Sequence, residues 1–400
     1  MLFVAEAMTL AHVVRLVTLA DAMHDSGAQV WLATDPRYSR YIGPLRYPVE
    51  TLRSLPAAEF FRALSTGARI FSFETLARYA KEDLALFSRL KPDAVVGDFR
   101  LSLGTSARHA GVPFINLTNA YWSPRARVRH IVPEYRWVSW LGHRLAQALF
   151  VSFRKLGFAH HASPVNRLRR SYGLPSLGND FGRLLIDGDF TCFADSPQVV
   201  PMDRLEVNQR FIGPVPWSPK VTLPPWWEKM RHEGETVPLV YVNLGSSGPP
   251  EVLQRVLDAV ESLPLRVVAA TPDQSARLRP TANARIAGLV PGDEACRLAK
   301  VVVCNGGSPA TYQAFAHGIP VIGIATNMDQ FLNMGAVEDS GHGRLLRSGG
   351  LKAAAIRDAV IRSLGDSELH RRTRKLSEEL AAAPSSSSQF QAACRSLVGR

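Results

Sequence analysis

The chain has 400 residues, which is enough for two domains that each bury a core of their own. Its hydrophobic content of 46% and charged content of 20% are typical of a globular protein. The net charge of +12 is compatible with an anionic ligand or an anionic membrane. The basic residues are spread widely and form no nucleic-acid-binding motif, so we expect no nucleic-acid partner.

The four cysteines lie far apart, and none is spaced with another cysteine or a histidine to complete a zinc site. We therefore expect reduced thiols, as in a cytosolic protein. The first ten residues have no basic stretch ahead of their apolar residues, which argues against a signal peptide. No apolar stretch reaches the roughly 18 residues that a membrane-spanning helix needs. These features together predict a cytoplasmic protein.

The first half of the chain alternates short apolar runs with helical patterns, which predicts a parallel α/β sheet. The predicted strands are 2–5, 29–34, 93–99, 113–118 and 189–195, and the predicted helices are 12–26 and 102–110. Residues 134–172 mix aromatic residues and arginine at helical spacing. A stretch rich in Pro and Trp, 213–237, is typical of a linker between domains.

A second alternating series follows this linker. Its predicted strands are 239–245, 265–271, 284–290, 301–305 and 320–325, and helices are predicted over 250–262 and 352–380. We therefore predict two parallel-sheet domains in series, 1–212 and 238–382, joined by the linker 213–237. A last helix over 383–400 is expected to pack back on the first domain. A ligand bound between two such domains would meet the carboxyl ends of both sets of strands.

Residues 301–334 carry the strongest sign of a ligand site. An apolar strand stops at Asn305-Gly306-Gly307, and Ser308 is the expected N-cap of a following helix that starts at Pro309. Glycines without Cβ atoms and the free N–H groups of a helix N-terminus let a phosphate approach the main chain. A second such turn, Gly245-Ser246-Ser247, adds two hydroxyls, and two turns suit a diphosphate. A Gly-Gly turn alone is weak evidence, because it often serves packing.

Asp329 and Gln330 follow the next predicted strand, at the carboxyl end where open parallel sheets bind ligands. A carboxylate beside an amide suits the vicinal hydroxyls of a sugar. An isolated Asp-Gln pair is more often part of a solvated loop, so the sugar interpretation depends on the glycine turns.

The order of these features resembles the nucleotide-sugar signature of the UDP-glycosyltransferase family. The matching motifs are the Gly-Ser-Ser turn, GLVPGDEACRLAKVVVCNGGSPATYQAFAHGIPVIG over 288–323, and MDQFLN over 328–333. The resemblance covers nearly the whole chain and includes residues 11–34. It implies the GT-B fold, in which two Rossmann-like, doubly wound parallel-sheet domains face each other across a cleft. The first domain would bind the acceptor and the second the nucleotide sugar.

The resemblance also implies an inverting transfer of a sugar from a UDP- or dTDP-sugar to a hydroxyl of a hydrophobic or phenolic small molecule or lipid. In the family pattern, Val290 lines the base, Gly306 and Gly307 take the diphosphate, and Asp329 and Gln330 hold the sugar hydroxyls.

Three positions depart from this pattern. Asn305 replaces a His that contacts a phosphate, Ala310 replaces Ser or Thr, and Gln313 replaces the Glu that binds the ribose. Asn cannot be positively charged, and Gln cannot accept hydrogen bonds with both terminal atoms. We therefore expect diphosphate binding to depend more on the backbone amides, on Ser308 and on the Ser246-Ser247 loop.

Transfer to an alcohol needs a base for the acceptor proton. His12 follows the first strand at the opening of a helix and coincides with the family's catalytic His. Asp98, at the end of the strand 93–99, coincides with the Asp that orients this His. Without the resemblance, His12 would be one of eleven histidines and Asp98 an equally good helix cap.

Asp187 and Asp189 match the Asp-x-Asp letters of metal-dependent transferases, but they lie in a predicted turn. We therefore expect no metal and no cofactor, with the nucleotide sugar as co-substrate. The aromatic and basic residues of 134–160, where the family's acceptor-binding helices vary, suit a hydrophobic acceptor or peripheral membrane contact, and core helices give the same pattern. A non-catalytic auxiliary protein that binds sugar nucleotides stays open as the alternative function. The sequence does not indicate the oligomeric state.

Overall fold

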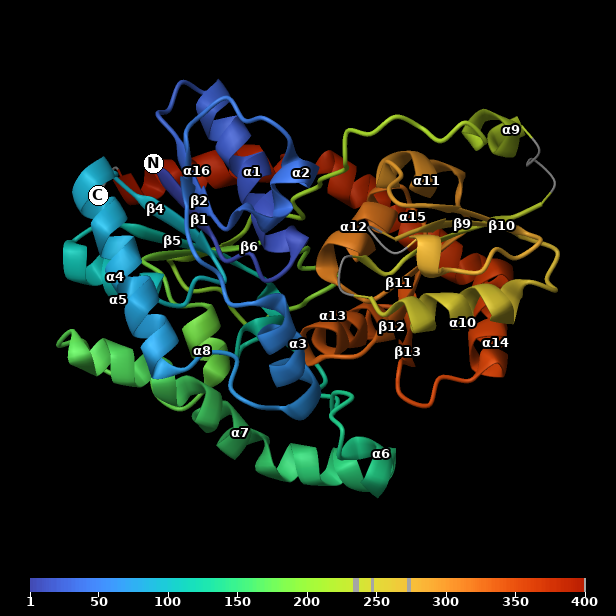
Figure 1. Cartoon of the computed structure of the whole chain (residues 1–400), viewed down its shortest axis with the longest axis horizontal. Helices are drawn as coiled ribbons and strands as arrows, with labels where there is room; N and C mark the ends of the chain where they lie inside the picture. Colours follow the sequence, from blue (N-terminus) through green and yellow to red (C-terminus); the bar gives the residue numbers. More distant parts are fainter. Residues whose placement is uncertain (233–236, 246–247, 272–274, 399–400) are drawn as a thin grey trace. The chain divides into compact units, whose positions relative to one another are not determined.

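The computed structural model describes residues 1–232, 237–245, 248–271 and 275–398 of the chain (Figure 1). The chain divides into two compact units. Unit 1 comprises residues 1–127, 135–215 and the segment from Pro384 onward, and unit 2 comprises residues 128–134 and 216–383. Each unit contains one parallel sheet, which confirms the predicted fold class of two parallel-sheet α/β domains.

The sheet of unit 1 has the strand order β3-β2-β1-β4-β5-β6-β7, and all neighbouring strands are parallel. Its strands are β1 (Leu2–Ala5), β2 (Trp31–Thr34), β3 (Val49–Thr51), β4 (Val95–Asp98), β5 (Phe114–Thr118), β6 (Phe190–Phe193) and β7 (Gln209–Phe211). The central strands β1, β4, β5 and β6 are buried along their whole length, as expected for strands with helices on both faces. The strand order reverses between β1 and β4, so this is the switch point where open parallel sheets bind ligands.

The helices described in unit 1 are α1 (Leu10–Asp25), α2 (Ser39–Ile42), α3 (Ala57–Thr66), α4 (Phe73–Leu90), α5 (Leu103–Ala110), α6 (Val138–Leu141), α7 (His143–Ser171), α8 (Phe181–Leu185) and α16 (Ser386–Val398). Four of them, α2, α3, α4 and α8, were not predicted from the sequence. The C-terminal α16 packs against α1 and β6, and the Phe390 ring lies 6.0 Å from that of Phe3. No helix in the described ranges is long and apolar enough to cross a membrane.

The sheet of unit 2 has six parallel strands in the order β10-β9-β8-β11-β12-β13 (Figure 1). They are β8 (Leu239–Asn243), β9 (Arg266–Ala270), β10 (Ala284–Ala287), β11 (Val301–Cys304), β12 (Val321–Ala325) and β13 (Gly343–Arg347). The helices are α9 (Trp227–His232), α10 (Pro250–Val260), α11 (Gly292–Leu298), α12 (Ser308–Ala316), α13 (Met328–Asp339), α14 (Ala353–Gly365) and α15 (Ser367–Ala382). The order reverses between β8 and β11, so the second sheet has its own switch point.

The division into units differs from the predicted domain boundary at residues 128–134, which belong to unit 2. The backbone N–H of Glu134 donates to Thr326 O at 2.8 Å, and Arg129 forms ion pairs with Glu338 and Asp339. These contacts join residues about 200 positions apart, so no local pattern in the sequence predicts them. The predicted linker 213–237 contains α9, whose Trp227 is buried.

Candidate active site

His12 and Asp98 lie together at the switch point of the first sheet. Asp98 ends β4 and is in register with Ala5 at the end of β1, while His12 lies in the first turn of the helix that follows β1. Asp98 Oδ1 is 2.8 Å from His12 Nδ1, and the carboxylate is buried. Because a carboxylate only accepts hydrogen bonds, Nδ1 carries the hydrogen. This leaves Nε2 of the partly exposed imidazole as the nitrogen able to take a proton.

Arg15 contacts the same carboxylate from α1, three residues after His12. Its Nε donates to Asp98 Oδ2 at 3.0 Å and its Nη2 to Asp98 Oδ1 at 2.9 Å. Burial is the largest single influence and works to lower the pKa of the Arg15 guanidinium, but the charges of Asp98, Tyr121 and Asp195 and the hydrogen bonds to Asp98 together outweigh it, so the pKa is raised. Arg15 was not predicted from the sequence, although an arginine one turn after the candidate base, within the apolar stretch 13–17, was a usable signal.

Two residues from later strands extend this arrangement. Arg15 Nη1 donates to Asn119 Oδ1 at 2.8 Å, and Asn119 Nδ2 donates to Asp195 Oδ1 at 3.0 Å. Asn119 follows β5 and Asp195 follows β6. The helix after β1, the end of β4 and the residues that follow β5 and β6 therefore contribute to one hydrogen-bonded chain that ends on His12.

The ring of Phe99 stacks on the His12 imidazole, with centroids 5.1 Å apart and an angle of 9° between the planes. The backbone of Phe99 has φ 59°, in the left-handed region that non-glycine residues rarely adopt. Such strain gathers at functional sites. The stacked ring restricts rotation of the imidazole and holds it toward Asp98.

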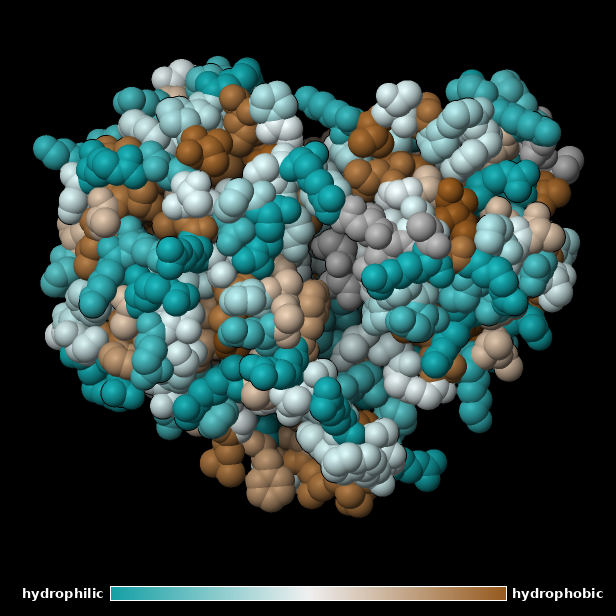
Figure 2. All heavy atoms as spheres, viewed as in Figure 1, coloured by the Kyte–Doolittle hydropathy of each residue, from teal (hydrophilic) through white to brown (hydrophobic). Residues whose placement is uncertain are grey.

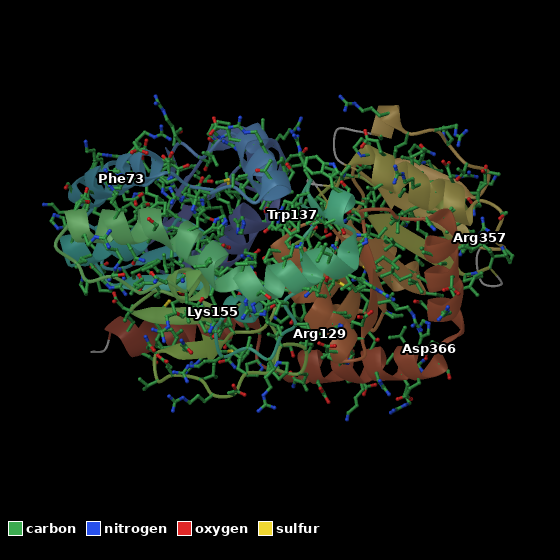
Figure 3. The ribbon with its side chains drawn as sticks, turned by 90° about the horizontal axis from the view of Figure 1, so that it is seen from below. Phe73, Arg129, Trp137, Lys155, Arg357 and Asp366 are labelled. Carbon is green, nitrogen blue, oxygen red and sulfur yellow. The ribbon has the colours of Figure 1, made fainter. Side chains whose placement is uncertain are left out.

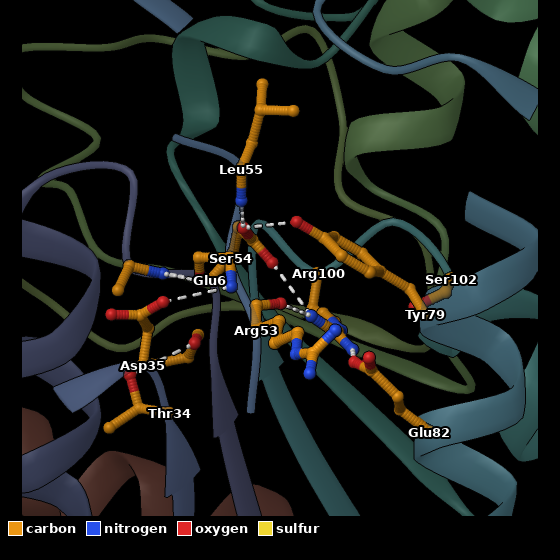
Figure 4. A network of polar contacts seen from close by, with 12 residues as sticks. Glu6, Thr34, Asp35, Arg53, Ser54, Leu55, Tyr79, Glu82, Arg100 and Ser102 are labelled. Atoms are coloured by element: carbon orange, nitrogen blue, oxygen red, sulfur yellow. Dashed lines mark hydrogen bonds and ion pairs between the residues drawn. The ribbon is translucent and has the colours of Figure 1, made fainter. Parts of the chain in front are cut away.

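A buried ion-pair network joins the loop between β1 and α1, which leads to His12, to the loop that follows Asp98 (Figure 4). Arg100, two residues after Asp98, donates from Nη1 to Glu6 Oε2 at 3.1 Å. Glu6, directly after β1, accepts a further hydrogen bond from the Tyr79 hydroxyl at 3.0 Å. Arg100 also donates to Asp83 Oδ1 at 3.1 Å. All four side chains are buried, so the network ties the loop after β1 to the loop after β4 without access to water.

The two glycine turns predicted to bind a diphosphate meet at the switch point of the second sheet. Gly245 lies just after β8, and Asn305-Gly306-Gly307 follows β11. A Cβ atom on Gly245 would lie 3.3 Å from Asn305 Nδ2, so the two turns touch. Ser246 and Ser247, which were predicted to contribute hydroxyls, lie outside the described residues.

The Asn305 side chain closes the second turn on itself. Its Oδ1 accepts a hydrogen bond from the Gly307 N–H at 3.1 Å, and the Gly306 N–H faces Cys304 Sγ at 3.3 Å. Both amides predicted to hold a diphosphate therefore have partners within the turn. The Gly307 amide would be available to an anion only if the Asn305 side chain turned away from it.

The backbone conformation and the packing around position 306 both require a glycine. Its φ is 78°, and a Cβ atom would lie 2.6 Å from Met334 Cγ. Its carbonyl accepts a hydrogen bond from Asn333 Nδ2 at 2.8 Å, which ties the turn to α13. The glycine at 306 is therefore required by packing whether or not a phosphate binds.

The helix after this turn starts one residue earlier than predicted. Gly307, with an extended backbone, occupies the N-cap position, and Ser308 is the first helical residue with Pro309 after it. The prediction of Ser308 as N-cap is therefore wrong, because the preceding glycine takes the extended conformation. Ser308 is buried, and its expected contact with a diphosphate remains a prediction.

Gln330 serves the start of α13. Its Oε1 accepts hydrogen bonds from the backbone N–H groups of Thr326 and Asn327, and Asn327 Oδ1 accepts from the Gln330 N–H, which completes a capping box. The amide oxygen of Gln330 is thus occupied by the backbone. Asp329 lies half-buried in the same first turn, where the helix dipole favours an acidic residue. Sugar binding by these two residues remains a prediction.

Gln313, at the position expected to face a ribose, contacts a carboxylate that the sequence analysis overlooked. Gln313 Nε2 donates to Asp293 Oδ1 and to the Trp217 carbonyl, both at 3.3 Å. The hydrogen bond to His317 lowers the pKa of Asp293, whose side chain is 41% exposed. Asp293 therefore offers the anionic oxygen that Gln313 lacks. Val290, expected to line the base, is almost fully buried.

Within the described ranges, no group of three or more His, Cys, Asp or Glu side chains is placed to hold a metal ion. Asp187 of the Asp-x-Asp sequence forms ion pairs with Arg108 at 2.9 Å and with Arg169 at 3.1 Å. The four cysteines are free and buried.

Residues 254–393 match the family model of the erythromycin biosynthesis protein CIII-like C-terminal domain. A PGL/p-HBAD biosynthesis glycosyltransferase of Mycobacterium tuberculosis (strain H37Ra) is 44% identical over 377 residues, which cover 94% of this chain and 87% of the relative. A PGL/p-HBAD biosynthesis rhamnosyltransferase of Mycobacterium bovis (strain BCG) is 43% identical over 377 residues, 94% of this chain and 83% of the relative. An inactive PGL/p-HBAD biosynthesis glycosyltransferase of the same strain is 43% identical over 259 residues, 65% of this chain and 70% of the relative.

Solved structures show the same fold. The spinosyn rhamnosyltransferase SpnG, in complex with the spinosyn aglycone, superposes with a TM-score of 0.71 at 20% identity over 98% of this chain and 99% of that chain. The calicheamicin glycosyltransferase CalG4 does so with a TM-score of 0.68 at 20% identity over 100% and 98%. Together with the close relatives, they show that the chain is a glycosyltransferase of the GT-B fold and belongs to the family of the PGL/p-HBAD biosynthesis glycosyltransferases.

Proposed function

We propose that the protein transfers a sugar, with inversion, from a dTDP- or UDP-sugar to a hydroxyl of a phenolic or lipid-like acceptor. The observation that carries this proposal is the hydrogen bond between His12 Nδ1 and Asp98 Oδ1, since it leaves His12 Nε2 as a base. The partial exposure of the imidazole gives an acceptor access to that nitrogen.

In the proposed reaction, His12 Nε2 takes the proton of the acceptor hydroxyl as the oxygen forms a bond to the anomeric carbon. The bond from that carbon to the diphosphate oxygen breaks, and its electron pair leaves with the diphosphate. Asp98 stabilises the imidazolium that results. A single displacement of this kind inverts the anomeric configuration. The N-terminus of α12 and the glycine turns would meet the charge of the departing diphosphate.

The donor base and sugar are supported by the relatives. SpnG has been solved in complex with thymidine diphosphate, and it superposes on this chain with a TM-score of 0.69. A relative at 43% identity is a rhamnosyltransferase. These observations favour a dTDP-sugar, with rhamnose as the first sugar to test. Asp293 is positioned to accept a hydrogen bond from a ribose hydroxyl beside Gln313.

The acceptor is proposed from the names of the relatives, which act in PGL biosynthesis, the phenolic glycolipid pathway. A phenol is a good acceptor for general-base catalysis because its hydroxyl loses a proton more easily than an alcohol does. A lipid-linked phenol is held at a membrane surface, so peripheral membrane contact belongs to this proposal.

A non-catalytic auxiliary protein is the second candidate, because one relative is an inactive glycosyltransferase. Such a protein would bind the nucleotide without needing a base. The intact set of His12, Asp98 and Arg15 favours catalysis over this alternative.

The test is transfer from dTDP-rhamnose and from a panel of UDP- and dTDP-sugars to a phenolic lipid and to a short soluble phenol, followed by mass spectrometry and by NMR of the new anomeric centre. We expect an inverted product, formed with or without EDTA, and a loss of about 10²–10⁴-fold in turnover for His12→Ala. The control variant His232→Ala, which alters an exposed histidine on α9, should keep the turnover of the unaltered protein. Nucleotide binding without transfer to any acceptor would support the auxiliary role instead.

A further inference from the structure

The large apolar side chains that the structure leaves exposed gather on one segment of unit 1. Seven of the twelve such residues in the described chain fall within positions 140–156: Trp140, Leu141, Leu145, Leu149, Val151, Phe153 and Leu156. Trp140 is 83% exposed, Leu156 68% and Phe153 58%. Scattered exposed apolar residues are ordinary, but a group of this size on two consecutive helices, α6 and α7, marks an interaction surface.

Four of these residues form a stripe along α7. Leu145, Leu149, Phe153 and Leu156 are spaced by four, four and three residues, which places them on one face of a helix. Between His143 and Gly157 only Ala146 is buried, and the other buried residues of the helix lie between Ala162 and Arg169. The N-terminal half of α7 is therefore largely exposed; it lies at the lower edge of Figure 1 and faces the viewer in Figure 3.

The charge around the stripe has one sign. Residues 135–179 contain seven Lys and Arg residues and no Asp or Glu. By the 3.6-residue period of the helix, Arg144 and Lys155 lie on the same side of the stripe, about a third of a turn from its centre. Lys155 is labelled on α7 in Figure 3, and brown side chains gather at the bottom of Figure 2, where Figure 1 places this helix.

We infer that α6 and the N-terminal half of α7, residues 138–157, dock on an anionic lipid bilayer. The apolar stripe and Trp140 enter the boundary between head groups and acyl chains, while Arg144 and Lys155 meet the lipid phosphates. A second copy of the chain fits this surface poorly, because two such segments would bring basic residues against basic residues without a single acid between them. This inference rests on the proposed function, because docking would bring the protein to an acceptor held in a membrane.

The direct test is co-sedimentation of the full chain with vesicles of phosphatidylglycerol or of phosphatidylcholine. We expect binding to the anionic vesicles, weaker binding to the neutral ones, and release as salt is added. The variant Trp140→Ser/Phe153→Ser/Leu156→Ser should lose roughly tenfold or more in vesicle partitioning, since binding scales with the apolar area buried. Arg144→Gln/Lys155→Gln should lose the preference for phosphatidylglycerol.

The matched control is Leu205→Ser/Val207→Ser/Ile361→Ser, which removes three exposed apolar residues from other elements. It should bind vesicles as the unaltered protein does. Thermal melting of each variant checks that the fold is kept. The inference is overturned if the unaltered protein does not bind phosphatidylglycerol vesicles. It is equally overturned if the α6–α7 variant, Trp140→Ser/Phe153→Ser/Leu156→Ser, binds them as strongly as the unaltered protein. It is also overturned if light scattering shows a dimer that this variant converts to a monomer, because the occupant is then a second copy.

Activity measurements separate this inference from the proposed function. The α6–α7 variant should transfer sugar to a short soluble phenol at the normal rate and to a phenolic lipid embedded in vesicles at a reduced rate. Equal rates on the embedded acceptor would contradict the inference and leave the transferase proposal standing. Vesicle binding without any sugar transfer would contradict the transferase proposal and leave the docking surface standing.

Discussion

The guanidinium of Arg15 holds the buried carboxylate of Asp98 through two hydrogen bonds, 3.0 Å from Nε to Oδ2 and 2.9 Å from Nη2 to Oδ1. Arg15 Nη2 also lies 3.4 Å from His12 Nδ1. The carboxylate that orients the candidate base is therefore shared with a permanent cation. This arrangement balances the buried negative charge of Asp98 and places a positive charge beside the imidazole.

Arg15→Gln should lower turnover on a soluble phenol, because it removes the guanidinium that fixes the Asp98 carboxylate, and this carboxylate orients His12. It should also lower the free energy of unfolding by up to roughly 3–5 kcal/mol, the usual cost of breaking a buried pair. Arg15→Lys keeps the charge but cannot make both hydrogen bonds in the same geometry, so its losses should be smaller. Steady-state kinetics and thermal unfolding measure the two effects, and normal turnover in Arg15→Gln would rule out a positioning role for Arg15.

Asp98→Asn should lower turnover by no more than His12→Ala does, since the imidazole remains but its tautomer and orientation are disturbed. The double variant should be little worse than His12→Ala alone, because the two side chains act as one unit. Steady-state kinetics on a soluble phenol measures both effects, and calorimetry should show unchanged nucleotide diphosphate binding in all three variants. Additive losses in the double variant would mean that Asp98 acts independently of His12.

Asn305→Asp keeps an acceptor for the Gly307 N–H and adds a negative charge beside the predicted diphosphate site. It should weaken nucleotide diphosphate binding by at least about tenfold, because two like charges roughly 4 Å apart cost on the order of 4 kcal/mol at an effective dielectric constant of about 20. Thermal stability without ligand should change little. Asn305→His, which restores the residue usual in the family, should bind nucleotide diphosphate as well as or better than the unaltered chain. Unchanged calorimetric affinity in Asn305→Asp would place the diphosphate elsewhere.

Gly306→Ala should destabilise unit 2 by roughly 2–4 kcal/mol, because it combines a positive φ with a Cβ atom 2.6 Å from Met334 Cγ. Gly307→Ala is the matched control, since Gly307 has φ −74° and a Cβ atom there would lie 3.3 Å from Asn305 Oδ1. Thermal unfolding of the two variants should therefore differ clearly. Equal melting temperatures would show that the turn relaxes around residue 306.

The alternation of apolar runs and helical patterns predicted the parallel strands β1, β2, β4, β5 and β6 and the whole series from β8 to β12. This was possible because a buried strand or an amphipathic helix has a characteristic spacing of apolar residues along the sequence. The edge strands β3, β7 and β13 were missed, and so were the helices α2, α3, α4, α8, α9, α11 and α13. The predicted family supplied the pairing of His12 with Asp98, which no local pattern contains.

Only the tertiary structure decided which side chains surround that pair. Arg15, Phe99, Asn119 and Asp195 come from different elements, and they meet because the strand order places β1, β4, β5 and β6 side by side. The capping role of Gln330 and the turn closed by Asn305 likewise depend on backbone groups whose directions the sequence does not state. The pattern of neighbouring residues determines where a helix or a strand forms. Contacts between side chains of different elements depend instead on the order of the strands in the sheet and on the loops that close over it.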